Sequence, residues 1–217
     1  MAGRIRGIHL CEETQVSDDR NHRWYLDLMM PNTKGEGFAW LYPPSLYADP
    51  AAFRQLLDDL AEPFLAERID LVAGLDATGF ILGAGLAARL NAGFLAIRKA
   101  GTVAAESETI SFTNYTGRTG EMEVHKPALA PGARVVLVDQ WIETGGTMRS
   151  SIALIERLGG VVAGVATICI EETKATEAMR RDYKCATAVV PGTSYQRQCN
   201  AHHLDSFDPG ENRATNR

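Results

Sequence analysis

The most regular hydrophobic pattern in the chain lies between residues 49 and 97. Apolar residues recur at helical spacing after Asp49-Pro50, and a proline at the first helical position favours a helix start there. Short apolar runs at 69–75 and 93–97 predict strands, and the Ala- and Gly-rich stretch 80–90 between them predicts a buried helix. A strand, a helix and a second strand within about thirty residues form a βαβ unit, so we expect the two strands to be parallel.

A second regular pattern starts after the Pro131-Gly132 turn. Residues 135–138 are apolar and mostly β-branched, which is typical of a strand buried on both faces of a parallel sheet. Farther along, the pattern predicts a helix after Thr147, a buried strand at 161–170, a short charged helix at 173–183 and a last strand at 187–191. Strands and helices alternating in this way predict an α/β fold with a doubly wound, mostly parallel sheet.

The remaining segments are less regular. Residues 23–30 predict a strand before the Pro31-Asn32 turn, and a loop-rich stretch with several Gly and Pro residues follows. The polar segment 100–115 and the two glycines after it predict a hairpin or mobile flap over a site. We therefore divide the chain into an N-terminal hood (1–48), a core (49–195) and a C-terminal tail (196–217) that we expect to be poorly ordered from His202 onward.

Composition narrows the class of protein. A chain of 217 residues with 45% hydrophobic and 23% charged residues is ordinary for a globular protein with a sizeable core. A net charge of −5 argues against nucleic acid as a partner, because phosphate neutralisation needs a basic face. The most apolar region, 71–97, contains charged residues and predicts no membrane span, and the N-terminus lacks the apolar run of a signal peptide. Four widely spaced cysteines form no metal or disulfide pattern, so we expect a reduced, cytoplasmic setting.

Polar groups stand where three of the predicted strands end. They are Asp76-Ala77-Thr78-Gly79, the pair Arg98-Lys99, and Asp139. Open α/β sheets bind ligands at the carboxyl ends of their strands, and a doubly wound sheet brings such ends together. One polar loop, one cation pair and one carboxylate suit a sugar phosphate or diphosphate, with a divalent ion bridging oxygens.

The segment Thr144-Gly145-Gly146-Thr147 is the strongest candidate for binding phosphate. Its glycines let backbone N–H groups converge, its threonines add hydroxyl donors, and the helix that follows contributes partial positive charge at its N-terminus. Such a turn suits a phosphate monoester. The alternative is an ordinary strand-to-helix turn with a threonine cap.

Other sites have weaker support. Gly79, Gly83 and Gly85 do not have the spacing of a dinucleotide fingerprint, and no lysine follows Gly145-Gly146 as it would in an ATPase loop. The histidines His22, His125, His202 and His203 fall in predicted turns or tails, where solvent exposure is a simpler expectation than catalysis.

The run from the apolar strand through Asp139 to the Thr-Gly-Gly-Thr turn resembles the phosphoribosyl diphosphate (PRPP) motif of type I phosphoribosyltransferases. The resemblance extends beyond the motif over roughly residues 45–190. In order and spacing, the segments that resemble adenine phosphoribosyltransferases are 49–54, 73–76, 79–80, 97–99 and 121–148.

This resemblance implies a Mg²⁺-dependent enzyme that transfers the 5-phosphoribosyl group of PRPP to a purine-like nitrogen base and releases pyrophosphate. It also implies the following roles. The residues Glu143, Thr144, Gly145, Gly146 and Thr147 would hold the 5′-phosphate, Asp139 and Gln140 would contact the ribose, and Asp139 would also bind the metal. Asp76, Ala77 and Thr78 would form the pyrophosphate loop, with Arg98 and Lys99 as nearby cations. Related enzymes are commonly dimers, so a homodimer is expected.

Several positions depart from the family pattern. Gln140 stands where the family usually has a second acid, and an amide cannot supply charge to Mg²⁺. Thr78 and Thr102 replace basic residues, and the flap glutamate of adenine enzymes aligns with Tyr115 or Thr116, which argues against adenine itself as the acceptor. The alternative is therefore a sensor or regulator that binds PRPP or a nucleotide without turnover. A transferase or phosphohydrolase acting on another phosphosugar is a third possibility.

Glu143 and Trp141 complete the set of candidates. Glu143 occupies the position of an aspartate that hypoxanthine-guanine relatives are proposed to use on the base nitrogen, so it is a candidate general base or proton carrier. Its alternative is a surface carboxylate turned away from the phosphate. We expect Trp141 to pack against the sheet rather than stack on a substrate.

Overall fold

The computed structural model describes residues 23–33, 39–102, 106–114 and 117–201. A seven-stranded sheet lies at its centre in the order β11-β9-β7-β3-β4-β6-β5. The strands are β3 (Leu71–Leu75), β4 (Gly93–Lys99), β5 (Ser107–Thr113), β6 (Thr119–His125), β7 (Arg134–Val138), β9 (Val161–Thr167) and β11 (Cys185–Thr187). The five from β11 to β4 pair in parallel, and β6 and β5 continue the sheet as an antiparallel hairpin. The predicted α/β fold with a mostly parallel sheet is confirmed.

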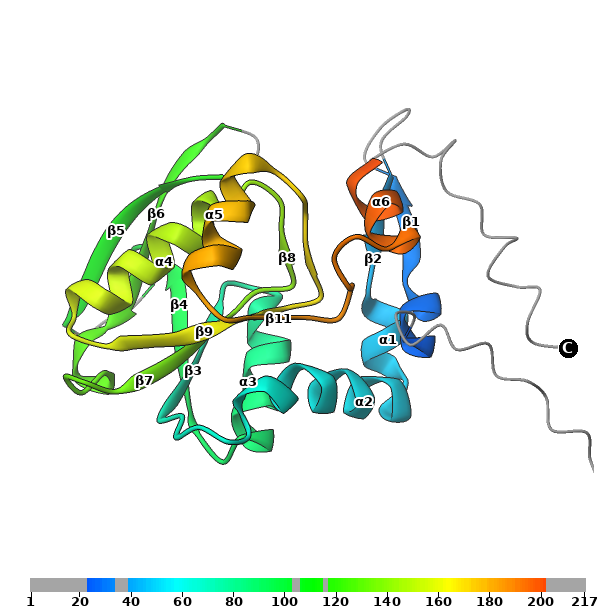
Figure 1. Cartoon of the computed structure of the whole chain (residues 1–217). Helices are drawn as coiled ribbons and strands as arrows, with labels where there is room; N and C mark the ends of the chain where they lie inside the picture. The colour runs from blue at the N-terminus through cyan, green and yellow to red at the C-terminus, as the bar shows by residue number, and fades with distance from the viewer. Residues whose placement is uncertain (1–22, 34–38, 103–105, 115–116, 202–217) are drawn as a thin grey trace, which may run out of the picture.

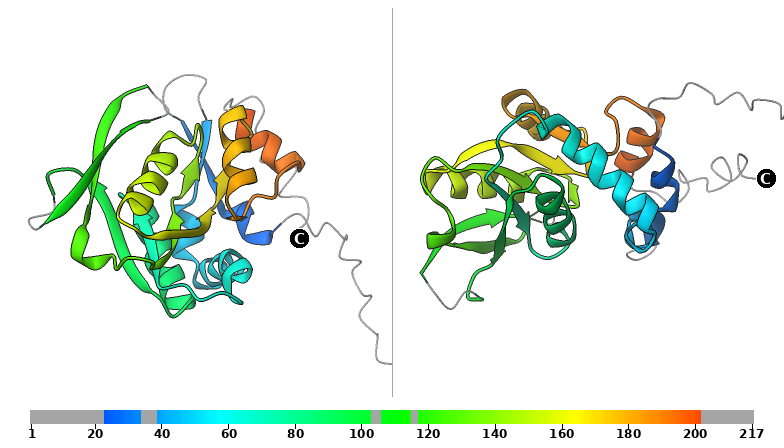
Figure 2. Two further views of the ribbon diagram at one scale, coloured as in Figure 1. Left: turned by 60° about the vertical axis from the view of Figure 1, so that its left-hand side comes forward. Right: turned by 90° about the horizontal axis from the view of Figure 1, so that it is seen from below.

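Helices cover both faces of this sheet (Figures 1 and 2). The helices α2 (Pro50–Ala61) and α3 (Gly79–Arg89) share one hydrophobic cluster with Val136 and Val138 of β7. The helices α4 (Gly146–Arg157) and α5 (Lys174–Asp182) share the other with Val135 and Leu137. Successive side chains of a strand point to opposite faces, so one apolar run supplies both layers of the core.

The N-terminal segment forms a lobe beside the sheet (Figure 1) and shares the hydrophobic cluster of α2 and α3. It contains a 3-10 helix η1 (Trp24–Leu28), an antiparallel pair β1 (Met30–Thr33) and β2 (Ala39–Tyr42), and the short helix α1 (Pro44–Ala48). The strand predicted at 23–30 is therefore wrong, because Tyr25, Leu26 and Met29 become buried on one side of a helical turn. Asp49 then caps α2, accepting hydrogen bonds of 2.9 Å from the amides of Ala51 and Ala52.

Two boundaries in the C-terminal half also differ from the sequence prediction. The strand expected at 161–170 is divided into β9 and β10 (Cys169–Ile170), and β10 pairs in parallel with β8 (Trp141–Ile142). The division falls where the amide of Ile168 donates a 3.2 Å hydrogen bond to the carbonyl of Gln140, in the loop before β8. The last strand is β11, which ends at Thr187 instead of beginning there.

A helix that the sequence pattern did not predict, α6 (Ser194–Ala201), crosses the proposed start of the tail at residue 196. It lies beside the N-terminal lobe, and the Tyr195 hydroxyl donates a 3.1 Å hydrogen bond to the carbonyl of Leu26. Tyr195 and Cys199 are buried against the core cluster. The division into hood, core and tail stays a prediction.

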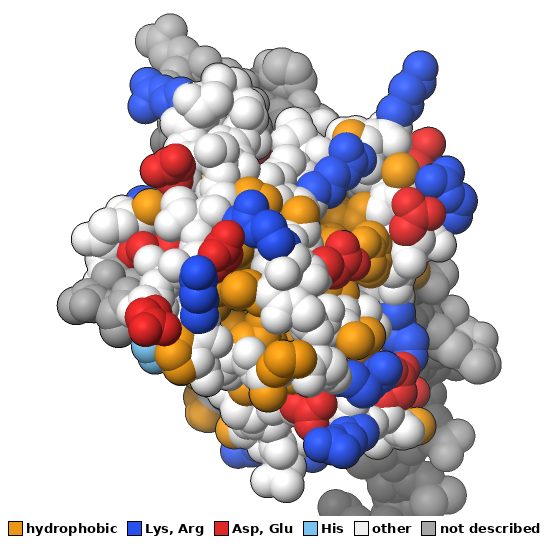
Figure 3. Space-filling view, turned by 90° about the vertical axis from the view of Figure 1, so that its left-hand side faces the viewer, with side chains coloured by type: hydrophobic (Ala, Val, Ile, Leu, Met, Phe, Trp, Pro, Cys, Tyr) orange, Lys and Arg blue, Asp and Glu red, His pale blue; other side chains and the backbone are white. Residues whose placement is uncertain are grey.

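Near the β5 edge, ion pairs of Glu108 link β5 to the turn after β6 and to the end of α4. Glu108 pairs with Lys126 at 2.9 Å and with Arg157 at 3.0 Å, and these contacts lower the pKa of its carboxyl. Figure 3 shows this side of the molecule, where apolar side chains lie among interspersed acidic and basic ones. Exposed pairs contribute little stability individually, but here they fix the strand whose far end reaches the cavity described below.

The cysteines of the described residues are not joined by disulfides. Cys169, Cys185 and Cys199 are free thiols, and Cys11 lies outside the described residues. Within the described ranges, every helix is too short or too polar to pass through a lipid bilayer.

Candidate active site

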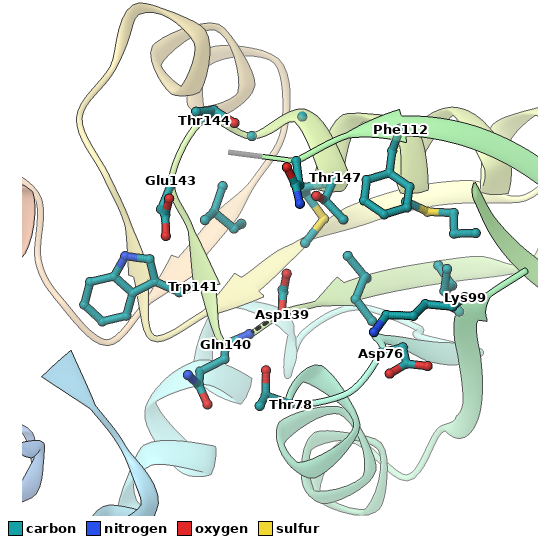
Figure 4. A pocket seen from close by; sticks show the side chains of 18 of the residues that line it. Asp76, Thr78, Lys99, Phe112, Asp139, Gln140, Trp141, Glu143, Thr144 and Thr147 are labelled. Atoms are coloured by element: carbon teal, nitrogen blue, oxygen red, sulfur yellow. Dashed lines mark hydrogen bonds between the residues drawn. The ribbon is translucent and has the colours of Figure 1, made fainter. Parts of the chain in front are cut away.

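A cavity of about 380 Å³ opens at the carboxyl ends of β3, β4 and β7 (Figure 4). It is lined by Leu75, Asp76, Thr78, Ile97, Arg98, Lys99, Phe112, Asn114, Met122 and the unbroken run Asp139–Met148. The three polar strand ends singled out from the sequence therefore meet in one place. Ala77 belongs to the same loop but is exposed and does not line the cavity.

Asp139 occupies the centre of the cavity in Figure 4. Its amide donates a 3.3 Å hydrogen bond to the carbonyl of Ala166, and its Oδ1 accepts one of 2.7 Å from the amide of Gln140. Burial raises the pKa of Asp139 to about 7, and the bond from Gln140 only partly offsets this. Among the ion pairs of the described residues, none involves Asp139. Its carboxylate is thus available to a ligand that brings a cation or hydroxyl donors.

The phosphate-loop candidates form the uncapped N-terminus of α4. Gly145 has a φ of +75°, a left-handed conformation that glycine adopts without steric cost, and no side chain caps the helix. The first hydrogen bond of the helix runs from the amide of Arg149 to the carbonyl of Gly145 at 2.9 Å. The amides of residues 146–148 precede it and point outward from the helix end, where an anion is stabilised by them and by the helix dipole.

Gly146 is required by close packing rather than by φ. A Cβ at this position would lie 2.4 Å from the carbonyl oxygen of Thr113, the last residue of β5. The absence of a side chain therefore lets the β5–β6 hairpin, which we call the flap hairpin, approach the phosphate-loop candidates directly. Thr144 is exposed, whereas Thr147 is half-buried at the cavity wall.

Trp141 and Glu143 lie side by side on the wall that faces the N-terminal lobe (Figure 4). The indole N–H of Trp141 donates a 2.8 Å hydrogen bond to the buried carboxylate of Glu171, and its ring packs against the hydrophobic core. Trp141 packs as predicted, but it also lines the cavity, so the expectation that it does not stack on a substrate stays a prediction. Glu143 lines the cavity with its side chain half-buried, which places a carboxylate beside the space left for a substrate.

On the opposite wall, Arg98 and Lys99 end β4, and Asp76 and Thr78 follow β3. The amide of Asp76 donates a 2.9 Å hydrogen bond to the carbonyl of Ile97, which ties the loop to the neighbouring strand. Both cations are exposed, and neither belongs to an ion pair among the described residues. This wall therefore offers positive charge to a ligand, consistent with the predicted diphosphate contact.

Sequence reasoning missed two residues that line the cavity and one that contacts its lining. Phe112 and Asn114 reach the cavity from the flap hairpin, a segment treated as generally polar, although Ile110 and Phe112 alternate with polar neighbours as strand residues do. Tyr47 was missed altogether. Its hydroxyl donates a 3.0 Å hydrogen bond to Oε1 of Gln140, and no local signal predicts a contact between residues 93 positions apart. Tyr115 and Thr116, aligned with the family's flap acid, lie outside the described residues, as do His22, His202 and His203.

Comparison with known proteins identifies what this geometry resembles. The sequence pattern of the phosphoribosyl transferase domain matches residues 45–204. The adenine phosphoribosyltransferase of Thermobifida fusca is 47% identical over 123 residues, 57% of this chain and 69% of that protein. That of Dinoroseobacter shibae is 43% identical over 137 residues, 63% of this chain and 76% of the relative. The crystal structure of adenine phosphoribosyltransferase from Thermoanaerobacter pseudethanolicus superimposes with a TM-score of 0.68 at 30% identity, covering 74% of this chain and 94% of that one.

Proposed function

The chain belongs to the phosphoribosyl transferase family, and on that premise we propose that it transfers the 5-phosphoribosyl group of PRPP to a purine-like nitrogen base and releases pyrophosphate. The observation that carries the proposal is the single cavity in which Asp139 lies between the uncapped N-terminus of α4 and the cations at the end of β4. The three parts of PRPP, a phosphate monoester, a ribose and a diphosphate, need these three environments in this order.

Each part of the cavity then has a role in the reaction. The loop Glu143–Thr147 holds the 5′-phosphate through its amides and hydroxyls, while Asp139 accepts a hydrogen bond from a ribose hydroxyl. The Asp76–Thr78 loop, Arg98 and Lys99 meet the diphosphate. The bond between the anomeric carbon and the pyrophosphate oxygen breaks, its electron pair leaves with pyrophosphate, and the base nitrogen forms the new bond to that carbon.

Glu143 is the group that we assign to the acceptor base. A base that attacks through nitrogen must lose a proton, and a carboxylate beside it can accept that proton. Phe112 on the flap hairpin covers the cavity from the opposite side, and exclusion of water by this hairpin protects an oxocarbenium-like state from hydrolysis.

The carboxylates present fit a magnesium ion that arrives with the substrate. Among the described residues no three His, Cys, Asp or Glu side chains cluster as a metal site. Mg²⁺ commonly binds one or two carboxylates and takes its remaining ligands from substrate phosphates and water, and Asp139 and Asp76 both line the cavity. When bound, the ion would neutralise charge on the departing pyrophosphate. Asp139 is our proposed protein ligand.

A direct test is isothermal titration calorimetry with PRPP and Mg²⁺, followed by a pyrophosphate-release assay with a panel of purine bases that includes adenine. We expect the wild type to bind PRPP, and Asp139→Ala and Thr147→Ala each to weaken binding at least about tenfold, the loss of one or two charge-assisted hydrogen bonds. Asp182→Ala, which removes an exposed aspartate at the end of α5, is the matched control. A wild type without affinity for PRPP would refute the proposal.

The alternative is a sensor that binds PRPP or a nucleotide without turnover. It is favoured by Gln140, whose amide oxygen accepts a hydrogen bond from Tyr47 at a position where the family has an acid. Binding without pyrophosphate release for any base would support it. A different phosphosugar recovered with the purified protein and identified by mass spectrometry would support the third possibility. A homodimer and a cytoplasmic setting stay predictions.

A further inference from the structure

Tyr47 of the N-terminal lobe contacts Gln140, which lines the cavity. Tyr47 on α1 donates its hydroxyl hydrogen bond to Oε1 of Gln140 over 3.0 Å. Its ring meets the ring of Phe53 edge-on, with centroids 5.7 Å apart and planes at 72°. The side chain is half-buried against the core, so the phenol is held at both its ring and its hydroxyl.

Gln140 is itself held at three points. Its backbone amide donates to Asp139, its backbone carbonyl accepts from Ile168, and its side-chain oxygen accepts from Tyr47. The amide nitrogen, by contrast, has no acceptor among the described residues, and it is not sealed from solvent. A glutamine that lines a cavity and whose amide oxygen is already engaged presents its N–H groups to a ligand.

We propose that Tyr47 is a positioning residue for the sugar site, holding Gln140 by its amide oxygen so that the amide nitrogen donates a hydrogen bond to a hydroxyl of the bound phosphosugar. The inference rests on the proposed function, since it concerns the same site. Asp139 supplies an acceptor and Gln140 a donor to the same cavity, a combination that suits two hydroxyls of one sugar. One hydroxyl donates to Asp139 while the other accepts from Gln140.

This arrangement differs chemically from a pair of carboxylates. Two carboxylates can only accept, so both sugar hydroxyls must donate to them. A donor beside an acceptor orients the two hydroxyls in opposite senses and needs no second negative charge. The phenol of Tyr47 is a better donor than acceptor, so its contact with Gln140 favours the orientation in which the amide oxygen faces Tyr47 and the amide nitrogen faces the ligand.

The test is a double-mutant cycle on the affinity for ribose 5-phosphate, measured by calorimetry on the full chain without metal. Tyr47→Phe should weaken binding about fivefold, the effect of one neutral hydrogen bond. Gln140→Met should weaken binding at least as much. In the Gln140→Met background, Tyr47→Phe should change the affinity less than about twofold, because Tyr47 then has no amide to hold. Gln140→Glu, which keeps an acceptor for Tyr47 but has no donor, should also weaken binding.

Two controls separate positioning from general damage. Inorganic phosphate has no sugar hydroxyl for Gln140 to bind, so its affinity should be unchanged in Tyr47→Phe. Tyr183→Phe removes a comparable hydroxyl hydrogen bond, 3.1 Å to Glu156 and remote from the cavity, and should leave ribose 5-phosphate binding as it is. Equal weakening of both ligands, additive effects of the two substitutions, unchanged binding in Tyr47→Phe, or no sugar phosphate binding by the wild type would each overturn the inference.

A different measurement tests the proposed reaction. Absence of pyrophosphate release with every base would refute phosphoribosyl transfer, while the cycle with ribose 5-phosphate would still report on Tyr47 and Gln140. Conversely, a wild type that turns over PRPP, with Tyr47→Phe binding ribose 5-phosphate normally, would overturn only the role of Tyr47.

Discussion

The indole N–H of Trp141 donates a 2.8 Å hydrogen bond to the carboxylate of Glu171, joining the wall of the cavity to the end of β10. Glu171 is 5% exposed, so its desolvation is offset only by such contacts. We expect Trp141→Phe to lower the free energy of unfolding by about 1–3 kcal/mol, measured by urea denaturation. Trp24→Phe is the matched control, because Trp24 is 51% exposed, and its effect should stay within about 0.5 kcal/mol. Equal effects of the two substitutions would contradict a stabilising role for the Trp141–Glu171 bond.

Asp139 should make stability depend on pH. Burial raises its pKa from 3.8 to about 7, so between these values the folded protein retains a proton that the unfolded chain releases. The free energy of unfolding should therefore fall as pH rises through this window and level off above it. Asp139→Asn removes the titrating group. The free energy of unfolding of this variant, taken relative to that of the wild type, should therefore be higher at pH 8.5 than at pH 5. Urea denaturation of both proteins without metal at the two pH values measures the difference, and parallel pH profiles would argue against a raised pKa.

Gly146→Ala should disrupt the contact between flap and phosphate loop. The new Cβ would lie 2.4 Å from the carbonyl oxygen of Thr113, so either β5 or the start of α4 must move. We expect inorganic phosphate affinity to fall at least about tenfold and the free energy of unfolding to fall by about 1–3 kcal/mol, as for other overpacked sites. Gly145→Asn tests the neighbouring position, where the requirement is a φ of +75° that asparagine tolerates. Gly145→Asn should lower the free energy of unfolding clearly less than Gly146→Ala does, and the reverse order would refute the packing argument.

Glu143→Gln tests the proposed proton acceptor. If Glu143 serves the base nitrogen, kcat for pyrophosphate release should fall about 100-fold or more, while the KM for PRPP should change little. Glu177→Gln, at an exposed position on α5, is the control. A large rise in KM with unchanged kcat would instead place Glu143 in PRPP binding. No change in either constant would mean that its carboxylate plays no part in turnover.

Much of the core could be predicted because its signals are local. The helix start at Asp49-Pro50 depends on a carboxylate that caps amides two and three residues away. The buried strand at 135–138 follows from apolar side chains on both faces of the same run. The helix that begins at Gly146 follows from a glycine turn and the apolar spacing after it. In each case the deciding contacts lie within one turn or one strand, where sequence spacing is also spatial spacing.

The errors fell where burial, rather than local preference, selects the structure. Tyr25, Leu26 and Met29 suit a strand by composition but form a helical turn because the core buries them together. The helix α6 was missed because its buried face consists of Tyr195, Gln196 and Cys199, a weak apolar pattern that gains its meaning only against the N-terminal lobe.

The sequence by itself determined the alternation of strands and helices, the glycine turn before α4, and the strand ends that carry Asp76, Arg98 and Asp139. Only the tertiary structure decided which side chains meet. It placed Tyr47 against Gln140 across 93 residues, brought Phe112 into the cavity, and buried Asp139 enough to raise its pKa to about 7. The physical reason is that periodicity and capping act over a few residues, whereas desolvation and hydrogen bonding between distant segments depend on how the whole chain packs.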